Sequence, residues 1–199
     1  MSGALPTSPE FNALSFKDEV NTLISVSDSG RRFARQIDNQ RWKFTCRYTN
    51  LTRAEFAPIF AFITKQRGSK ETFTITPPNL KNALGSETTT ISVNGSHTAG
   101  DTTIAIDGFN ADDAGSLKAG DFLKFASHTK VYQVVSDVTP SSNAATVTIE
   151  PPLLEALADD STVTYDSVPF TVYLTSGVQS YSMGTNNLYN YEFDVCEAF

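Results

Sequence analysis

The stretch from Arg41 to Pro78 constrains the fold most strongly, because it changes its period twice with clear boundaries. From Arg41 to Tyr48 the residues alternate between apolar or aromatic and basic or polar. This period of two is typical of a strand with one buried face. Residues 53–67 then repeat apolar side chains at helical spacing, and residues 71–76 alternate again until two prolines follow. The stretch therefore predicts a strand, a helix and a second strand.

The predicted helix has signals at both ends. Thr52 and Glu55 have the spacing of a capping box, and Gly68 suits a left-handed stop. Pro58 predicts a bend in the axis, because it removes one backbone hydrogen bond inside the helix. The apolar stripe of this helix consists of Phe56, Ile59, Phe60 and Ile63.

Short alternating runs separated by turns occupy most of the remaining chain. Residues 21–27 and 31–37 flank the turn at 28–30, and they predict an antiparallel meander that continues through a tight connection at 38–39 into the strand at 40–48. In the middle of the chain, six short strands are predicted at residues 90–93, 102–107, 121–125, 130–138, 145–150 and 162–165. Residues 153–157 are the one helical hint among them. Six short strands in about eighty residues favour a small antiparallel barrel or sandwich.

The end of the chain shows the same strand-like alternation as its beginning. Residues 168–174 and 188–195 are strand-like, and the acidic face of the second run complements the basic face of residues 41–47. We therefore expect a mainly β protein in which residues 12–80 and 168–199 form a discontinuous core with one flanking α-helix. Residues 81–167 are expected to form an inserted small antiparallel β-barrel module, and residues 1–11 a flexible N-terminus.

The charge is distributed unevenly along the chain. Residues 1–80 hold 11 Lys and Arg against 7 Asp and Glu, whereas the remainder holds 4 against 15, for a net charge of −7. Copies of the chain are therefore suited to meet basic part to acidic part in a closed ring, although the same charges also serve solubility. The candidate subunit-interface residues are Arg31, Arg32, Arg35, Arg41, Lys43, Arg47, Glu192 and Asp194. Their basic members resemble a nucleic-acid surface, but the acidic net charge disfavours tight binding of nucleic acid.

Few residues have the pattern of a catalytic or metal site. His97 and His128 lie in turn-like segments without the partners of a triad or a zinc motif. The acidic pairs at 112–113 and 159–160 lack an EF-hand spacing, so loop charge is the favoured interpretation. The sequence thus predicts no enzyme, no cofactor and no metal.

Cys46 and Cys196 fall on strand faces of different character, which disfavours a disulfide between them. The first ten residues have neither a basic nor an apolar targeting segment, and the sequence contains no run of 18 apolar residues. The chain is therefore expected to be soluble and made in a cytoplasm, without a membrane partner.

Several groups of residues resemble the core of tail proteins from long-tailed bacteriophages. These groups are 29–32, 40–44, 51–58, 66–68 and 71–73, and residues 117–125, 131–134 and 151–153 resemble the inserted β module that some of these proteins contain. Among tail proteins, the chain most resembles the distal tail protein at the junction of tail tube and tip, which is related to tail-tube subunits.

The resemblance implies a structural virion protein with a tail-tube-like β-sandwich. It implies a ring, usually a hexamer, that joins the tail tube to the tip complex and lines a channel for the tape measure protein and then for DNA, which passes without specific binding. The implied partners are further copies of the chain, the tail-tube protein, tail-tip hub proteins and the tape measure protein. The implied location is the virion tail, assembled in the host cytoplasm. The alternatives are a major tail-tube subunit, a carbohydrate-binding tail-tip accessory module and a tail-associated hydrolase.

Overall fold

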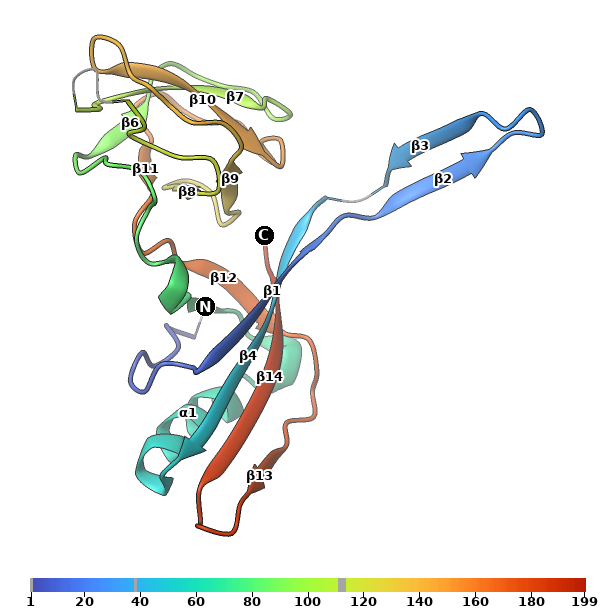
Figure 1. The fold of residues 1–199 in the computed structure, drawn as a ribbon, viewed down its shortest axis with the longest axis vertical. Helices are drawn as coiled ribbons and strands as arrows, with labels where there is room; N and C mark the ends of the chain where they lie inside the picture. Colours follow the sequence, from blue (N-terminus) through green and yellow to red (C-terminus); the bar gives the residue numbers. More distant parts are fainter. Residues whose placement is uncertain (1, 38, 111–113) are drawn as a thin grey trace. The chain divides into compact units, whose positions relative to one another are not determined.

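The computed structural model describes residues 2–37, 39–110 and 114–199 (Figure 1). The chain divides into two compact units. Unit 1 comprises Met1–Phe73 and Val172–Ala198, and unit 2 comprises Thr74–Thr171 together with Phe199. Within the described part of the chain, no helix combines the length and the apolar character that crossing a membrane requires.

The main sheet joins the two ends of the sequence. Its strands follow the order β1 (Ala13–Glu19), β4 (Arg41–Leu51), β14 (Tyr189–Glu197), β12 (Phe170–Leu174) and β5 (Phe73–Ile75), and β13 (Tyr181–Met183) also pairs with β14. β4 pairs antiparallel with both β1 and β14, so it lies at the centre of the long strands. The register places Phe44 opposite Phe16 and Val195, which brings apolar residues of three strands together.

One face of β4 is buried as its alternation predicts. Trp42, Phe44, Cys46 and Tyr48 are each at most 5% exposed, whereas the residues between them are half-buried or exposed. The ring of Phe16 lies 4.9 Å from the rings of both Trp42 and Phe44. The alternation therefore fixes which face of the sheet carries the core.

The helix α1 (Arg53–Lys65) covers part of this core (Figure 1). The Glu55 carboxylate accepts a hydrogen bond from the Thr52 amide at 2.8 Å, which confirms half of the capping box directly. Phe56, Ile59 and Ile63 are buried and Phe60 is half-buried, so the predicted stripe is confirmed. The helix runs through Pro58 to Lys65. The bend predicted there stays a prediction.

The helix ends at Lys65, two residues earlier than predicted. Arg67 has a φ of 56° and Gly68 a φ of 68°, so the first left-handed residue is the arginine. The chain then passes through the short 3₁₀ segment η1 (Gly68–Lys70) into β5. A glycine at the second left-handed position removes the steric cost that a side chain would add there.

The predicted meander before the helix is wrong in its pairing. β2 (Thr22–Val26) and β3 (Arg32–Gln36) pair with each other in a separate two-stranded sheet, and β4 pairs with β1 instead. The cause is side-chain character: Leu14 and Phe16 give β1 an apolar face that packs on β4, whereas β2 and β3 mix apolar and basic residues on both faces. The connection at Asp38 lies outside the described residues.

The N-terminal segment, for which the sequence predicts flexibility, contacts unit 1. The Ser2 amide donates a hydrogen bond to the Thr72 carbonyl at 2.8 Å, and the Leu5 side chain is 6% exposed. These contacts dock the segment on the remainder of its own unit.

Unit 2 contains a closed barrel of six short strands. They are β6 (Ile91–Val93), β7 (Thr103–Asp107), β8 (Phe122–Phe125), β9 (Tyr132–Val134), β10 (Ala144–Glu150) and β11 (Thr162–Thr164). The order around the barrel is β10-β7-β6-β11-β8-β9, and β9 closes onto β10. The predicted mainly β class with one flanking helix and a small antiparallel barrel is thus confirmed. Closure leaves the barrel without an open edge.

The helical hint at residues 153–157 is wrong. The Leu153 amide donates to the Asp101 carbonyl at 2.9 Å, and Leu157 exchanges backbone hydrogen bonds with His97 at 2.9 and 3.1 Å. These bonds hold the segment against its neighbours, with bends at Leu154 and Glu155 and a β-bridge at Leu157. Both leucines are nearly fully buried in the barrel core, so packing rather than helical spacing explains their positions.

The two ends of the barrel segment are tied together. The Ser167 amide donates to the Lys81 carbonyl at 2.6 Å, and the Ala83 amide donates to the Asp166 carboxylate at 2.8 Å. Side-chain carboxylates also cap two turns that lead into barrel strands. In each turn the carboxylate, of Asp101 or of Asp121, accepts a hydrogen bond from the backbone amide three residues earlier. Such side-chain caps stabilise tight turns locally.

We predict that a fragment of residues 81–167 folds on its own, because its strands close on one another and its ends are hydrogen-bonded. Circular dichroism should show β structure with cooperative thermal unfolding, and amide resonances should be dispersed by NMR. A matched fragment that lacks residues 162–167 loses β11 and should be unfolded. An unfolded 81–167 fragment contradicts an autonomous insertion.

Candidate subunit interface

The eight candidate interface residues lie on two separate surfaces of unit 1. The first surface is the exposed face of the main sheet, defined here as the charged face. It carries Arg41, Lys43 and Arg47 from β4 and Glu192 and Asp194 from β14, together with Lys17 and Glu19 from β1. The register places Glu192 opposite Arg47 and Asp194 opposite Thr45, so the acidic and basic strand faces meet as predicted.

Charges on this face compensate one another within the chain. Arg47 pairs with Glu192 at 2.5 Å, and Lys43 pairs with Glu19 at 2.6 Å. The hydrogen bond to Glu19 raises the pKa of Lys43, and burial acts in the opposite direction. The Thr45 hydroxyl donates to the Asp194 carboxylate at 2.6 Å. Exposed pairs of this kind contribute about 0–1 kcal/mol each, so they organise the surface more than they stabilise it.

The second surface is the hairpin of β2 and β3, which carries the remaining candidates Arg31, Arg32 and Arg35. Every residue of both strands is exposed. The guanidinium of Arg31 lies 5.4 Å from the centre of the Phe33 ring, a cation–π distance. The structure therefore does not bring the hairpin arginines to the acids of the charged face within one chain, because the hairpin is a sheet of its own.

A groove lies beside β13 at the edge of the charged face. Its lining includes Ser180, Tyr181 and Ser182 from the β13 segment, Arg47 from β4, and Glu192 and Asp194 from β14. Two candidate acids thus border a hollow that the sequence interpretation missed. The signal was present as the alternation of Tyr181, Ser182 and Met183 after the turn at Ser176-Gly177, but three residues are too few to predict a strand.

Both histidines have structural roles. His128 is buried, its Nδ1 is hydrogen-bonded with the Tyr132 hydroxyl at 2.9 Å, and that hydroxyl accepts a hydrogen bond from the Leu154 amide at 3.1 Å. His97 Nε2 accepts from the Ala105 amide at 3.2 Å. Each imidazole thus makes hydrogen bonds within the barrel unit.

Acidic residues in the barrel loops also bind backbone amides. Asp159 accepts hydrogen bonds from the Gly95 amide at 2.6 Å and from the Asp160 amide at 3.1 Å. The pair at 112–113 lies outside the described residues. Among residues 2–37, 39–110 and 114–199, no group of three or more His, Cys, Asp and Glu is placed to hold a metal ion.

The two cysteines are buried free thiols. Burial, with a smaller effect of Asp194, raises the pKa of Cys46 to about 12, so this thiol stays protonated and unreactive at neutral pH. The predicted absence of a disulfide between Cys46 and Cys196 is confirmed.

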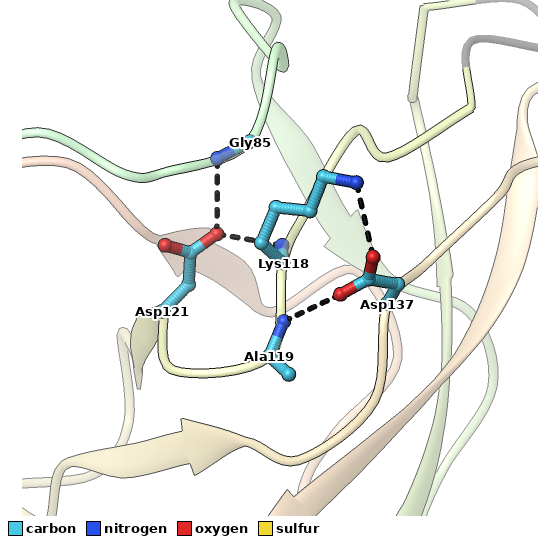
Figure 2. Close-up of polar contacts among 5 residues, drawn as sticks. All are labelled: Gly85, Lys118, Ala119, Asp121 and Asp137. Atoms are coloured by element: carbon cyan, nitrogen blue, oxygen red, sulfur yellow. Dashed lines mark hydrogen bonds and ion pairs between the residues drawn. The ribbon is translucent and has the colours of Figure 1, made fainter.

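Asp121 holds the entry into the barrel (Figure 2). Asp121 is 3% exposed, and its carboxylate accepts hydrogen bonds from the amides of Leu84 at 2.6 Å, Gly85 at 3.3 Å and Lys118 at 2.7 Å. Gly85 is required at this point, because a β-carbon there would lie 2.1 Å from the Ser116 carbonyl oxygen. The carboxylate thus fixes two segments that are more than thirty positions apart in sequence.

Asp137 binds the same turn from the solvent side (Figure 2). It accepts from the Ala119 amide at 3.0 Å and pairs with the Lys118 ammonium at 3.0 Å. The Ala119 hydrogen bond and then the Lys118 side chain hold the pKa of Asp137 below its usual value. Asp121 and Asp137 therefore bind one turn from a buried and an exposed position.

Glu87 is a second buried carboxylate of the barrel. It accepts hydrogen bonds from the amides of Thr88 and Thr89, from the Thr89 hydroxyl at 2.6 Å and from the Asn110 amide. Burial alone acts to raise the pKa of Glu87, but these hydrogen bonds together lower it. The folded barrel therefore stabilises the ionised form of the Glu87 carboxyl relative to its protonated form.

We predict that Asp121→Asn destabilises the barrel by about 1–3 kcal/mol, because the amide group keeps the shape but offers one acceptor oxygen to three amides. The matched control is Asp137→Asn on the exposed side of the same turn, for which the loss should be smaller. Calorimetry would follow the barrel, while Trp42, the only tryptophan, reports on unit 1 by fluorescence. Equal effects of the two variants contradict the role of Asp121.

We predict that Glu87→Gln lowers stability at neutral pH and weakens the loss of stability on acidification. The folded-state pKa of Glu87 lies below its ordinary value of 4.5, so its contribution is present above pH 4.5 and is lost as the pH falls through the folded value. Thermal unfolding between pH 7 and pH 3 would measure this. Parallel curves for the variant and the native chain exclude the linkage.

Comparison with protein families matches the barrel segment of the chain. Residues 81–168 match the model of the B domain of distal tail protein pb9, a segment that covers less than half of the 199 residues and contains all six barrel strands. No curated protein matches the chain. The family match supports association with other tail proteins and a location in the virion tail. The match of the barrel segment confirms the predicted resemblance of the chain to the distal tail proteins of bacteriophages. It also supports a structural role in a phage tail.

Proposed function

We propose that this chain is the ring subunit of a distal tail structure, joining the tail tube to the tip complex. The observation that carries the proposal is the match of residues 81–168 to a distal tail protein B domain. A structural role also fits the hydrogen bonds that both histidines make within the barrel unit. We accordingly propose no enzymatic activity.

In this proposal the chain consists of a discontinuous core and an insertion. Residues 12–80 and 168–199 are the tail-tube-like core, and residues 81–167 are the inserted barrel. The pairing of β4 with β14 supports this division, because it joins the two parts of the proposed core in one sheet. Hydrogen bonds between the two ends of the barrel segment support it from the other side.

We propose that the charged face lines the channel of the ring. Four cations, Lys17, Arg41, Lys43 and Arg47, face three carboxylates on this surface, so its charge is nearly balanced. A balanced wall within a protein of net charge −7 attracts the phosphate backbone of DNA weakly. DNA and the tape measure protein can then pass without specific binding.

The partners follow from this placement. The chain would associate with itself in a ring, with a hexamer as the expected size, and it would contact the tail-tube protein on one side and the tail-tip hub proteins on the other. Assembly would take place in the host cytoplasm before the virion is complete. Of the eight candidate interface residues, this proposal keeps the hairpin residues Arg31, Arg32 and Arg35 for contacts between subunits, because it assigns the five on the charged face to the channel wall.

Negative-stain imaging and native mass spectrometry of the purified chain test the proposal. We expect closed rings with a central opening and a single mass that is a multiple of the 21.7 kDa chain. Extended filaments would instead favour a major tail-tube subunit. A monomer that binds a defined glycan on an array would favour a carbohydrate-binding accessory module. Either result contradicts the distal ring.

A further inference from the structure

The sequence contains a single Asn-Gly pair, Asn94-Gly95, and the structure places it in the bend that follows β6 of the barrel. Asn94 is exposed, and a β-carbon built on Gly95 would meet no atom within 4 Å apart from its chain neighbours. Because glycine has no side chain, its backbone nitrogen is poorly shielded and its conformation is adaptable. Asparagine before glycine is therefore prone to lose its side-chain amide without the help of an enzyme.

The reaction would use the backbone nitrogen of Gly95 as its nucleophile. Once this nitrogen has lost its proton to hydroxide, it attacks Cγ of Asn94 and closes a succinimide ring. The Cγ–Nδ2 bond breaks, and the leaving nitrogen takes up protons from water and departs as ammonia. A water molecule then opens the ring at either carbonyl, which leaves aspartate or isoaspartate at position 94. Water is the only co-reactant, and no group is oxidised or reduced.

Asp159 holds the nitrogen that would attack. Its Oδ1 accepts a hydrogen bond from the Gly95 amide at 2.6 Å, a short distance for an amide donor and a carboxylate. The hydrogen bond stabilises the protonated amide, and the negative carboxylate disfavours the amide anion that must form before the attack. Both effects lower the reactivity of the Gly95 nitrogen toward the Asn94 side chain.

Backbone hydrogen bonds fix the chain on the other side of this pair. The Asn94 amide donates to the Ala105 carbonyl at 2.9 Å, and the Asp160 amide donates to the Val93 carbonyl at 3.0 Å. Ring closure needs a rotation of the backbone that brings the Gly95 nitrogen to Cγ of Asn94, and these bonds restrict that rotation. The turn at residues 159–160 therefore binds the segment both before and after Asn94.

We infer that Asn94 is a site of spontaneous covalent modification, and that the Asp159 carboxylate slows the conversion in the folded chain. The inference gives a specific role to one member of the acidic pair at 159–160. It is independent of the proposed tail function, because all of its contacts lie within unit 2.

Conversion would change the barrel. Isoaspartate carries the main chain through the former side-chain carbon, so it adds a backbone atom between the Asn94 bond to Ala105 and the backbone bonds that His97 exchanges with Leu157. These bonds set the register at both ends of the bend, and an added atom cannot be accommodated without shifting one of them. The thermal stability of the barrel should therefore fall as isoaspartate accumulates.

The test compares variants of the full chain. Asp159→Ala removes both the acceptor and the charge, whereas Asp159→Asn keeps a carbonyl acceptor and removes only the charge. The matched control is Asp160→Gly, which removes the neighbouring carboxylate of the same turn. Glycine accommodates the φ of 60° that Asp160 has, so the control should keep the backbone of the turn.

Each protein would be incubated in mildly alkaline buffer, and peptide mapping by mass spectrometry would follow the mass gain of about 1 Da in the peptide that contains Asn94. The native chain unfolded in urea sets the rate without the Asp159 contact, and the folded native chain should react more slowly. Asp159→Ala should react faster than the folded native chain by about tenfold or more, because a hydrogen bond to a charged group is lost. Asp159→Asn should lie between these two rates, and Asp160→Gly should match the native chain.

Circular dichroism would establish that each variant is folded under the incubation conditions. If Asp159→Ala is unfolded, the comparison of Asp159→Asn with the native chain decides. A folded native chain that reacts as fast as the unfolded one overturns the inference. An Asp159 variant that reacts no faster than the native chain, or a control that reacts as fast as Asp159→Ala, also overturns it.

Discussion

The pairing of β4 with β14 is the contact on which unit 1 depends. It joins residues near position 45 to residues near position 194, and it positions the core under α1, the charged face above it and β13 at its edge. The entropy of closing a loop grows only with the logarithm of its length, so about 0.6 kcal/mol is added for each doubling. A long insertion between the two strands is therefore tolerated when matched apolar faces such as Phe44 and Val195 meet across the pair.

Two surfaces of unit 1 meet water in different ways. On the charged face, Lys43 pairs with Glu19 and Arg47 pairs with Glu192, so these four charged side chains have partners within the chain. On the hairpin, by contrast, Leu23, Phe33 and Ile37 remain exposed without a covering layer from their own sheet. A strand that alternates apolar and basic residues can therefore bury its apolar face, as β4 does between two neighbouring strands. It can also leave that face exposed, as the two-stranded hairpin does.

The sequence predicted elements that carry their own local signals. The alternation of Trp42, Phe44, Cys46 and Tyr48 gave the buried face of β4, and the capping residues Thr52 and Glu55 gave the start of α1. The six barrel strands were predicted because turn residues separate them. What failed was pairing: β1 was missed although Leu14 and Phe16 alternate, and the hairpin was placed beside β4, because partners distant in sequence leave no local trace. The buried acceptors Asp121 and Glu87 were missed for the same reason, since their amide donors are identified by the fold.

The hydrogen bond between Ser167 and Lys81 has a consequence for how such proteins diversify. When the first and last residues of a domain lie side by side, the distance between its two connections to the remaining chain is nearly fixed, whatever the domain contains. Another closed domain with neighbouring ends can replace the barrel without altering the spacing of the strands that receive it. The barrel could therefore be replaced during evolution without changes in the sequence of the main sheet.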